Sequence, residues 1–77
     1  MNLKEYLERS IKEGASDLHL ATGNPPMIRA NGEMIMIAET ALSNKDILGM
    51  VSSLLDDQQR TTFEAEKDVD FTIDFDA

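Results

Sequence analysis

Residues 27–38, MIRANGEMIMIA, contain the local signal that decides the fold. Asn31 and Gly32 are the residue types that supply the two positive φ angles of a type I′ turn, and alternating apolar residues flank them. The segment therefore predicts a β-hairpin with a two-residue turn, and such a turn fixes the register of its strands. The predicted cross-strand pairs are Ala30 with Glu33, Arg29 with Met34, Ile28 with Ile35, and Met27 with Met36.

The two faces of this hairpin differ in character. The face predicted to point inward carries Ile28, Ile35 and Ile37. The other face carries Met27, Arg29, Met34 and Met36. Three methionines make this second face too apolar for a surface that stays in contact with water, and flexible thioether side chains suit a protein partner. We therefore expect the second face to be a subunit interface.

A helix and a strand are predicted upstream of the hairpin. Residues 2–14 repeat apolar side chains every four positions, which indicates an amphipathic helix ending at Gly14. Its predicted apolar stripe consists of Leu3, Leu7 and Ile11, with Tyr6 beside them. Residues 16–21, SDLHLA, alternate as a half-buried strand does. This pattern places Leu18 and Leu20 on one face and Asp17 and His19 on the other.

Two helices and a strand are predicted downstream. Residues 43–57 begin with a Ser43/Asp46 capping box. Their predicted apolar stripe is Ile47, Met50, Val51, Leu54 and Leu55. Residues 56–68 predict a shorter helix that starts at Asp56 or Asp57 and packs through Phe63. Residues 69–77 alternate as a strand, with Val69, Phe71, Ile73 and Phe75 inward and Asp70, Thr72, Asp74 and Asp76 outward.

This order of elements indicates an α+β fold with helices on one face of a largely antiparallel sheet. The last strand carries four large apolar residues, as interior strands do, yet nothing follows Ala77 to pair with it. We therefore expect residues 1–77 to be a single truncated domain, the front end of a longer protein. The isolated piece is expected to dimerise through its last strand, or to aggregate.

Composition excludes several classes of function. The net charge is −8, and residues 39–77 carry ten Asp/Glu against three Lys/Arg, so the chain is not expected to bind nucleic acid or an anionic membrane surface. The chain has no apolar run of membrane-spanning length, and residues 1–14 lack the apolar core of a signal peptide. No membrane insertion and a cytoplasmic location are therefore expected. The absence of Cys is compatible with that compartment.

The sequence offers little catalytic chemistry. Asp17 and His19 lie side by side on one strand face. They could act as an acid/base pair, contact a partner domain, or simply form hydrogen bonds with polar neighbours, and the sequence leaves these three roles open. A lone His without Cys is a poor metal site, and the aspartates at 70, 74 and 76 lack the spacing of a calcium loop. No Gly-x-x-x-x-Gly-Lys-Ser/Thr motif occurs. We expect no catalytic, metal or cofactor-binding residue in this fragment.

The run at residues 14–32, GASDLHLATGNPPMIRANG, resembles the N-terminal region of the type IV pilus retraction ATPases, PilT-type members of the type II/IV secretion ATPase family. The matching positions are Ser16 to Leu20, Gly23, Pro25, Pro26, Arg29 and Gly32. Residues 54–64 and 68–73 resemble family segments in the same order, so the resemblance covers essentially the whole chain. Asn31 replaces the usual Asp before the turn glycine, and both favour the turn.

This resemblance implies an N-terminal PAS-like domain, followed beyond residue 77 of the parent by a RecA-like ATPase domain that binds ATP and Mg²⁺. It also implies a cytoplasmic homo-hexamer that acts on pilus or secretion machinery at the inner membrane. Each N-terminal domain would pack on the ATPase domain of the adjacent subunit, and the expected interface residues are Asp17, His19, Met27, Arg29, Met34 and Met36. A stand-alone PAS-like domain that binds a ligand or acts as an adaptor is the alternative.

Overall fold

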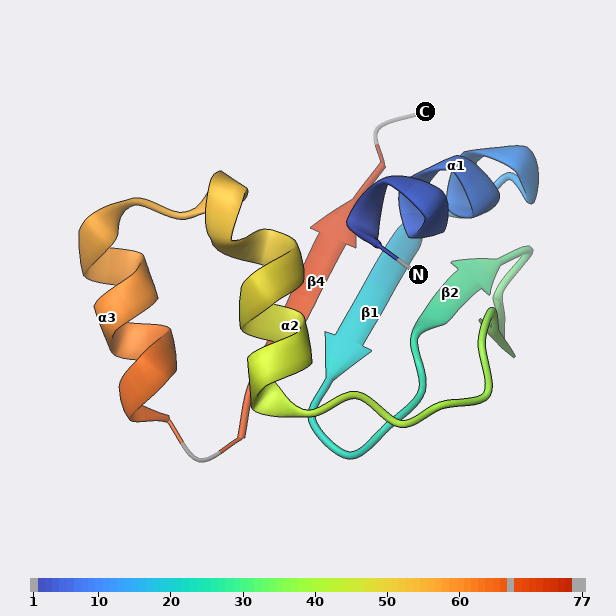
Figure 1. Ribbon diagram of the computed structural model, residues 1–77. Coiled ribbons are helices and arrows are strands. Elements are labelled where there is room, and N and C mark those ends of the chain that lie inside the picture. The colour runs from blue at the N-terminus through green and yellow to red at the C-terminus, as the bar shows by residue number, and fades with distance from the viewer. Residues whose placement is uncertain (1, 67, 76–77) are drawn as a thin grey trace.

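The computed structural model describes residues 2–66 and 68–75, and in this part of the chain three α-helices accompany a four-stranded antiparallel sheet (Figure 1). In chain order the elements are α1 (Leu3–Lys12), β1 (Asp17–Ala21), β2 (Met27–Ala30), β3 (Glu33–Met36), α2 (Asn44–Val51), a 3₁₀ turn (Ser52–Leu54), α3 (Asp57–Ala65) and β4 (Asp70–Asp74). The spatial order of the strands is β3-β2-β1-β4. The predicted α+β class is confirmed.

The β2–β3 hairpin has the predicted turn and register. Asn31 and Gly32 have φ angles of 53° and 78°, as a type I′ turn requires. The observed pairs are Ala30 with Glu33, Arg29 with Met34, Ile28 with Ile35, and Met27 with Met36. The short turn therefore determines which side chains of both strands face the helices.

Helix α1 packs on the core with most of its predicted stripe: Tyr6 is buried, and Leu3 and Leu7 are half-buried against the core. Asn2 caps the helix by accepting a hydrogen bond from the Glu5 backbone N–H at 3.0 Å. Tyr6 and Ser10 are buried, whereas Ile11 is 68% exposed, so the prediction of Ile11 in the buried stripe is wrong. The Ser10 hydroxyl donates to the Tyr6 carbonyl oxygen at 2.7 Å. Because that bond satisfies the hydroxyl, the small Ser10 can face the core.

Helix α2 begins where predicted and ends earlier. Both hydrogen bonds of the Ser43/Asp46 capping box are present, at 3.1 and 3.0 Å. The α-helix ends at Val51, and a 3₁₀ turn with about three residues per turn follows. The tighter winding leaves Leu55 buried but Leu54 55% exposed, so the prediction of Leu54 in the apolar stripe is wrong.

Helix α3 starts after Asp56, which forms a second capping box with Gln59. The ring of Phe63, in the last turn of α3, lies 5.8 Å from the ring of Phe71 in β4, measured between centroids. The predicted role of Phe63 in packing this helix is confirmed.

Strand β4 pairs with β1 on one side, with Leu18 opposite Ile73 and His19 opposite Thr72. The alternation is as predicted: Val69 is buried and Phe71, Ile73 and Phe75 are half-buried, whereas Asp70, Thr72 and Asp74 are exposed. Within residues 2–66 and 68–75, however, β4 forms the edge of the sheet rather than its interior. Asp76 and Ala77, which the sequence assigns to this strand, lie outside the described residues.

The core lies between the sheet and helices α1 and α2. Leu18 and Leu20 of β1, Ile28 of β2, and Ile47 and Val51 of α2 are fully buried. At the end of β1, Thr22 holds the next elements in place: its backbone N–H donates to the Val69 carbonyl at 2.9 Å, and its hydroxyl oxygen accepts from the Val69 N–H at 2.8 Å. The same hydroxyl contacts the side-chain oxygen of Asn44 at the start of α2.

Candidate functional site

The predicted interface residues lie together on one face of the sheet, opposite the face that packs against α1 and α2. We call this surface the open face and define it by Asp17 and His19 of β1, Met27 and Arg29 of β2, and Met34 and Met36 of β3. The register connects them, because Arg29 lies opposite both Asp17 and Met34, and Met27 lies opposite both His19 and Met36. Met34 and Met36 are 43% and 55% exposed.

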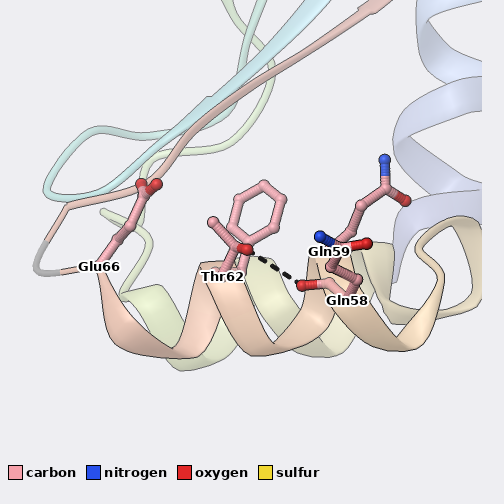
Figure 2. A pocket seen from close by; sticks show the side chains of 5 residues that line it. Gln58, Gln59, Thr62 and Glu66 are labelled. Atoms are coloured by element: carbon pink, nitrogen blue, oxygen red, sulfur yellow. Dashed lines mark hydrogen bonds between the residues drawn. The ribbon is translucent and has the colours of Figure 1, made fainter.

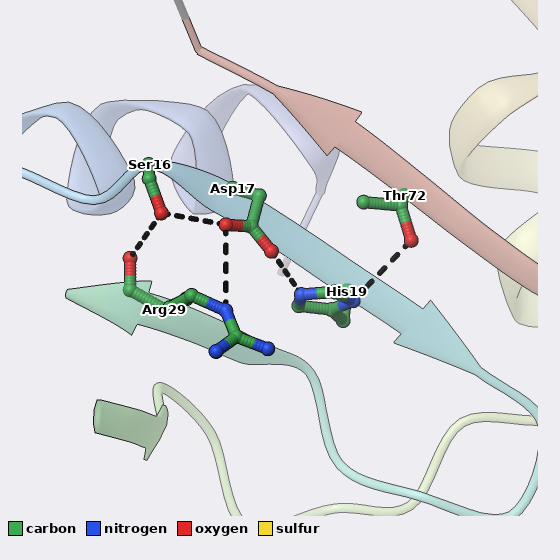
Figure 3. A network of polar contacts seen from close by, with 5 residues as sticks. All are labelled: Ser16, Asp17, His19, Arg29 and Thr72. Atoms are coloured by element: carbon green, nitrogen blue, oxygen red, sulfur yellow. Dashed lines mark hydrogen bonds and ion pairs between the residues drawn. The ribbon is translucent and has the colours of Figure 1, made fainter. Parts of the chain in front are cut away.

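The polar half of the open face is a network centred on Asp17 (Figure 3). The Ser16 hydroxyl donates to Asp17 Oδ1 at 2.6 Å, and Arg29 Nε lies 3.7 Å from the same oxygen. His19 Nε2 contacts Asp17 Oδ2, and His19 Nδ1 lies 3.3 Å from the Thr72 hydroxyl oxygen. The network therefore joins β2, β1 and β4 across the face.

Sequence reasoning missed Ser16 and Thr72 as members of this network. Ser16 precedes β1 and could have been found from its position next to Asp17. Thr72 is 53 residues from His19 and reaches it only because β4 pairs with β1. The predicted pair Asp17–His19 is brought together as the two-residue spacing on a strand requires.

The network favours the ionised form of Asp17. The hydrogen bond from Ser16 is the main cause that lowers the pKa of Asp17, and His19 and Arg29 lower it further, while desolvation opposes them. The carboxylate is thus a fixed negative charge between a guanidinium and an imidazole.

Replacing Asp17 by asparagine is expected to make stability less dependent on pH in acid. Because the folded-state pKa of Asp17 is lowered from 3.8, its contribution to folding is fully present above pH 3.8 and is lost as the pH falls below that value. The Asp17→Asn variant lacks this contribution, so its stability should fall less than that of the parent chain on acidification. Urea unfolding followed by circular dichroism at a series of pH values measures the difference.

The Asp46→Asn variant is a matched control for this measurement. The pKa of Asp46 is also lowered, through its hydrogen bonds with Ser43, but Asp46 belongs to the cap of α2 and not to the open face. In each single variant the free energy of unfolding should depend less on pH in acid than in the parent chain. In the double variant the two reductions should add. An Asp17→Asn variant with the same pH profile as the parent chain would contradict the stabilising role of the network.

Across residues 2–66 and 68–75, no three His, Asp or Glu side chains are grouped so that they could hold a metal ion. Within the same residues, each helix is too short or too polar to cross a membrane.

Comparison with known proteins identifies the relatives of this chain. No protein-family model matches it. Two curated proteins of Pseudomonas aeruginosa match nearly all of it, and both are type IV pilus ATPases. The chain is 39% identical to the type IV pilus retraction ATPase PilT over 74 residues, which are 96% of this chain and 22% of PilT. It is 29% identical to the type IV pilus ATPase PilU over 73 residues, 95% of this chain and 19% of PilU.

The chain is therefore homologous to one part of the PilT and PilU ATPases, and the resemblance seen in residues 14–32 is confirmed. It spans about a fifth of the length of the curated relatives it matches.

Proposed function

We propose that this chain is the N-terminal assembly and regulatory domain of a hexameric ATPase that drives type IV pilus retraction or type II secretion. In this proposal a PAS-like domain packs on the ATPase domain of the neighbouring subunit and transmits its ATP-driven movement. Homology to two pilus ATPases over almost the whole chain is the observation that carries the proposal. ATP and Mg²⁺ would bind in the remainder of the parent protein, which would act in the cytoplasm on pilus or secretion machinery at the inner membrane.

The composition of the open face supports a contact with another protein. Its apolar half consists of Met27, Met34 and Met36, and its polar half of Asp17, His19 and Arg29. Apolar side chains bordered by charged groups are typical of protein interfaces. Methionine adapts its shape to a partner, so this face can keep contact with a neighbour that moves during an ATPase cycle.

The same network resembles the nucleophile–base–acid triad of a hydrolase, because the Thr72 hydroxyl lies next to His19 and His19 contacts Asp17. A hydrolase also needs free donors that stabilise a developing oxyanion. His19 lies in β1, which is paired on both sides, with β2 and with β4, so the backbone N–H groups of its own strand serve sheet hydrogen bonds. This arrangement favours a contact surface over catalysis.

A chimaera tests the proposal. We expect that PilT of Pseudomonas aeruginosa, with its matching segment replaced by this chain, assembles into rings and hydrolyses ATP. Met34→Glu in the chimaera should weaken assembly about tenfold, because a buried unpaired carboxylate at an interface costs at least 1–2 kcal/mol. Sedimentation and ATPase assays measure both properties.

Ile11→Glu is the matched control, since Ile11 is equally apolar and 68% exposed but lies on α1, away from the open face. It should leave assembly unchanged, and both variants should leave the circular dichroism of the 77-residue chain unchanged. Normal rings with normal ATP hydrolysis in the Met34→Glu chimaera would rule out the open face as the subunit contact. Failure of the unsubstituted chimaera to assemble would count against the proposed function itself.

A further inference from the structure

A hollow of about 260 Å³ lies where α1, α2 and the segment between β3 and α2 meet. We call it the Tyr6 hollow, and its wall consists of Tyr6, Ala38, Thr40, Leu42, Asp46 and Met50. Tyr6 and Leu42 belong to the core on the helix side of the sheet, so this hollow is separate from the open face. A cavity of about 150 Å³ already holds benzene, so a space of this size admits a small organic molecule.

The Tyr6 hydroxyl is a polar group of this hollow without a partner. Tyr6 is 4% exposed, and no group within residues 2–66 and 68–75 forms a hydrogen bond with its hydroxyl. By contrast, the buried Ser10 hydroxyl on the same helix donates to the Tyr6 carbonyl oxygen at 2.7 Å. Buried polar groups are almost always hydrogen-bonded, so an unpartnered one beside a hollow favours a bound ligand. A ligand can reach it, since among the described residues only His19 Nε2 is both unpartnered and sealed from solvent.

The charges around the Tyr6 hydroxyl favour a cation. Burial is the main cause that raises the pKa of Tyr6, and the negative charges of Glu5 and Asp46 raise it further. Hydrogen bonds from Ser43 lower the pKa of Asp46, so this carboxylate is ionised. Its Oδ2 accepts from the Ser43 N–H at 3.0 Å, but a carboxylate has about four acceptor positions, so others are left for a ligand. The start of α2 adds about half a positive charge, which the full charge of Asp46 outweighs.

We propose that the Tyr6 hollow binds the alkylammonium ion of a small aliphatic amine. The ammonium group would pair with Asp46 and donate a hydrogen bond to the Tyr6 hydroxyl oxygen, using two of its three N–H donors. The alkyl chain would lie against the apolar part of the wall, which is formed by Ala38, Leu42 and Met50. This inference rests on a site away from the open face and is independent of the proposed function.

A second hollow, of about 230 Å³ beside α3, shows the contrast (Figure 2). It is lined by Gln58, Gln59, Thr62, Phe63 and Glu66. The polar side chains of this set are all exposed to water, and the Thr62 hydroxyl already donates to the Gln58 carbonyl at 3.0 Å. This second hollow therefore offers a ligand no buried polar group, and we expect the amine to bind at the Tyr6 hollow instead.

The test titrates pentylammonium chloride into the 77-residue chain at neutral pH. Tyr6 is the only tyrosine and the chain has no tryptophan, so tyrosine fluorescence reports on this hollow directly. We expect a saturable change with pentylammonium. Binding of 1-pentanol should be about tenfold weaker, because the alcohol cannot form the ion pair, and pentanoate should not bind, because Asp46 repels it.

Asp46→Asn removes the charge but keeps an oxygen that can accept from the Ser43 N–H, so it should weaken binding of pentylammonium about tenfold. Asp56→Asn is the matched control: it makes the same change in the cap of α3, outside the Tyr6 hollow, and should bind as the parent chain does. Circular dichroism establishes that each variant is folded.

Tyr6→Phe separates a ligand-binding role of the hydroxyl from a structural one. Binding, followed in this variant by NMR, should weaken about fivefold, because the ammonium group loses one hydrogen bond. The free energy of unfolding should not fall, since the hydroxyl has no partner in the described part of the chain.

Four results would overturn the inference. They are no saturable binding of pentylammonium, equal binding of 1-pentanol, unchanged binding by folded Asp46→Asn, and a loss of stability without a loss of binding in Tyr6→Phe. Nα-acetyl-lysine methylamide carries the same ammonium group on a peptide unit. If this compound bound and pentylammonium did not, the hollow would belong to a protein partner and the inference would also be wrong.

Discussion

Replacement of Leu18 by alanine is expected to lower the free energy of unfolding by about 3 kcal/mol, from the range measured when leucine is truncated in a core. Leu18 is 0% exposed in β1, opposite Ile28 of β2 on one side and Ile73 of β4 on the other. Paired strands on both sides keep β1 in place, so the surrounding structure can close little of the cavity. Urea unfolding followed by circular dichroism measures the loss.

Met36→Ala is the matched control, because Met36 belongs to the same sheet but is 55% exposed. Its truncation should change the free energy of unfolding by about 0.5 kcal/mol or less. A loss of about 3 kcal/mol is a large share of the stability of a domain of this size. If Leu18→Ala were no more destabilising than Met36→Ala, the placement of β1 between β2 and β4 would be wrong.

Replacement of Thr22 by valine is expected to cost about 2 kcal/mol of stability and to loosen the start of β4. The two side chains have nearly the same shape, but valine cannot accept the hydrogen bond that the Val69 N–H donates to the Thr22 hydroxyl at 2.8 Å. Val69 is buried, so its N–H would lose its acceptor away from water, and such a group costs about 1–3 kcal/mol. The contact of the hydroxyl with Asn44 would be lost too.

The measurement combines urea unfolding with hydrogen exchange of the β4 amides. Thr61→Val makes the same chemical change on the exposed side of α3, where the hydroxyl donates to the Asp57 carbonyl at 3.0 Å, and should have a much smaller effect. We expect faster exchange at Val69 in Thr22→Val than in Thr61→Val. Equal stability and equal exchange in the two variants would contradict the role assigned to Thr22.

The sequence predicts six residues of the candidate site, but it does not predict that Ser16 and Thr72 join them. Alternation along residues 16–21 and the register of the hairpin place Asp17, His19 and the methionines on matching faces of their strands. The face of β1 and the face of the hairpin form one surface because β1 pairs with β2. The sequence has no local signal for that pairing. Thr72 joins the network because β4 pairs with β1, and this pairing brings it to His19, 53 residues away in the sequence.

Errors in the prediction of burial have a common cause. Helical periodicity shows which side chains share a stripe, but the docking angle of the helix and the path of the chain after it decide which of them reach the core. Ile11 stays in solvent because α1 rests on Tyr6 and Ser10, and Leu54 does so because the chain tightens into a 3₁₀ turn after Val51.

The sequence by itself determined the features that depend on neighbours along the chain: the type I′ turn at Asn31–Gly32, the caps at Ser43 and Asp56, and the alternation of each strand. These follow from backbone sterics and from hydrogen bonds that span only a few residues. The tertiary structure alone decided that β4 lies beside β1 and that Thr72 therefore lies opposite His19. Such pairings join residues some fifty positions apart, and the burial of the whole core, rather than any local preference, selects among them.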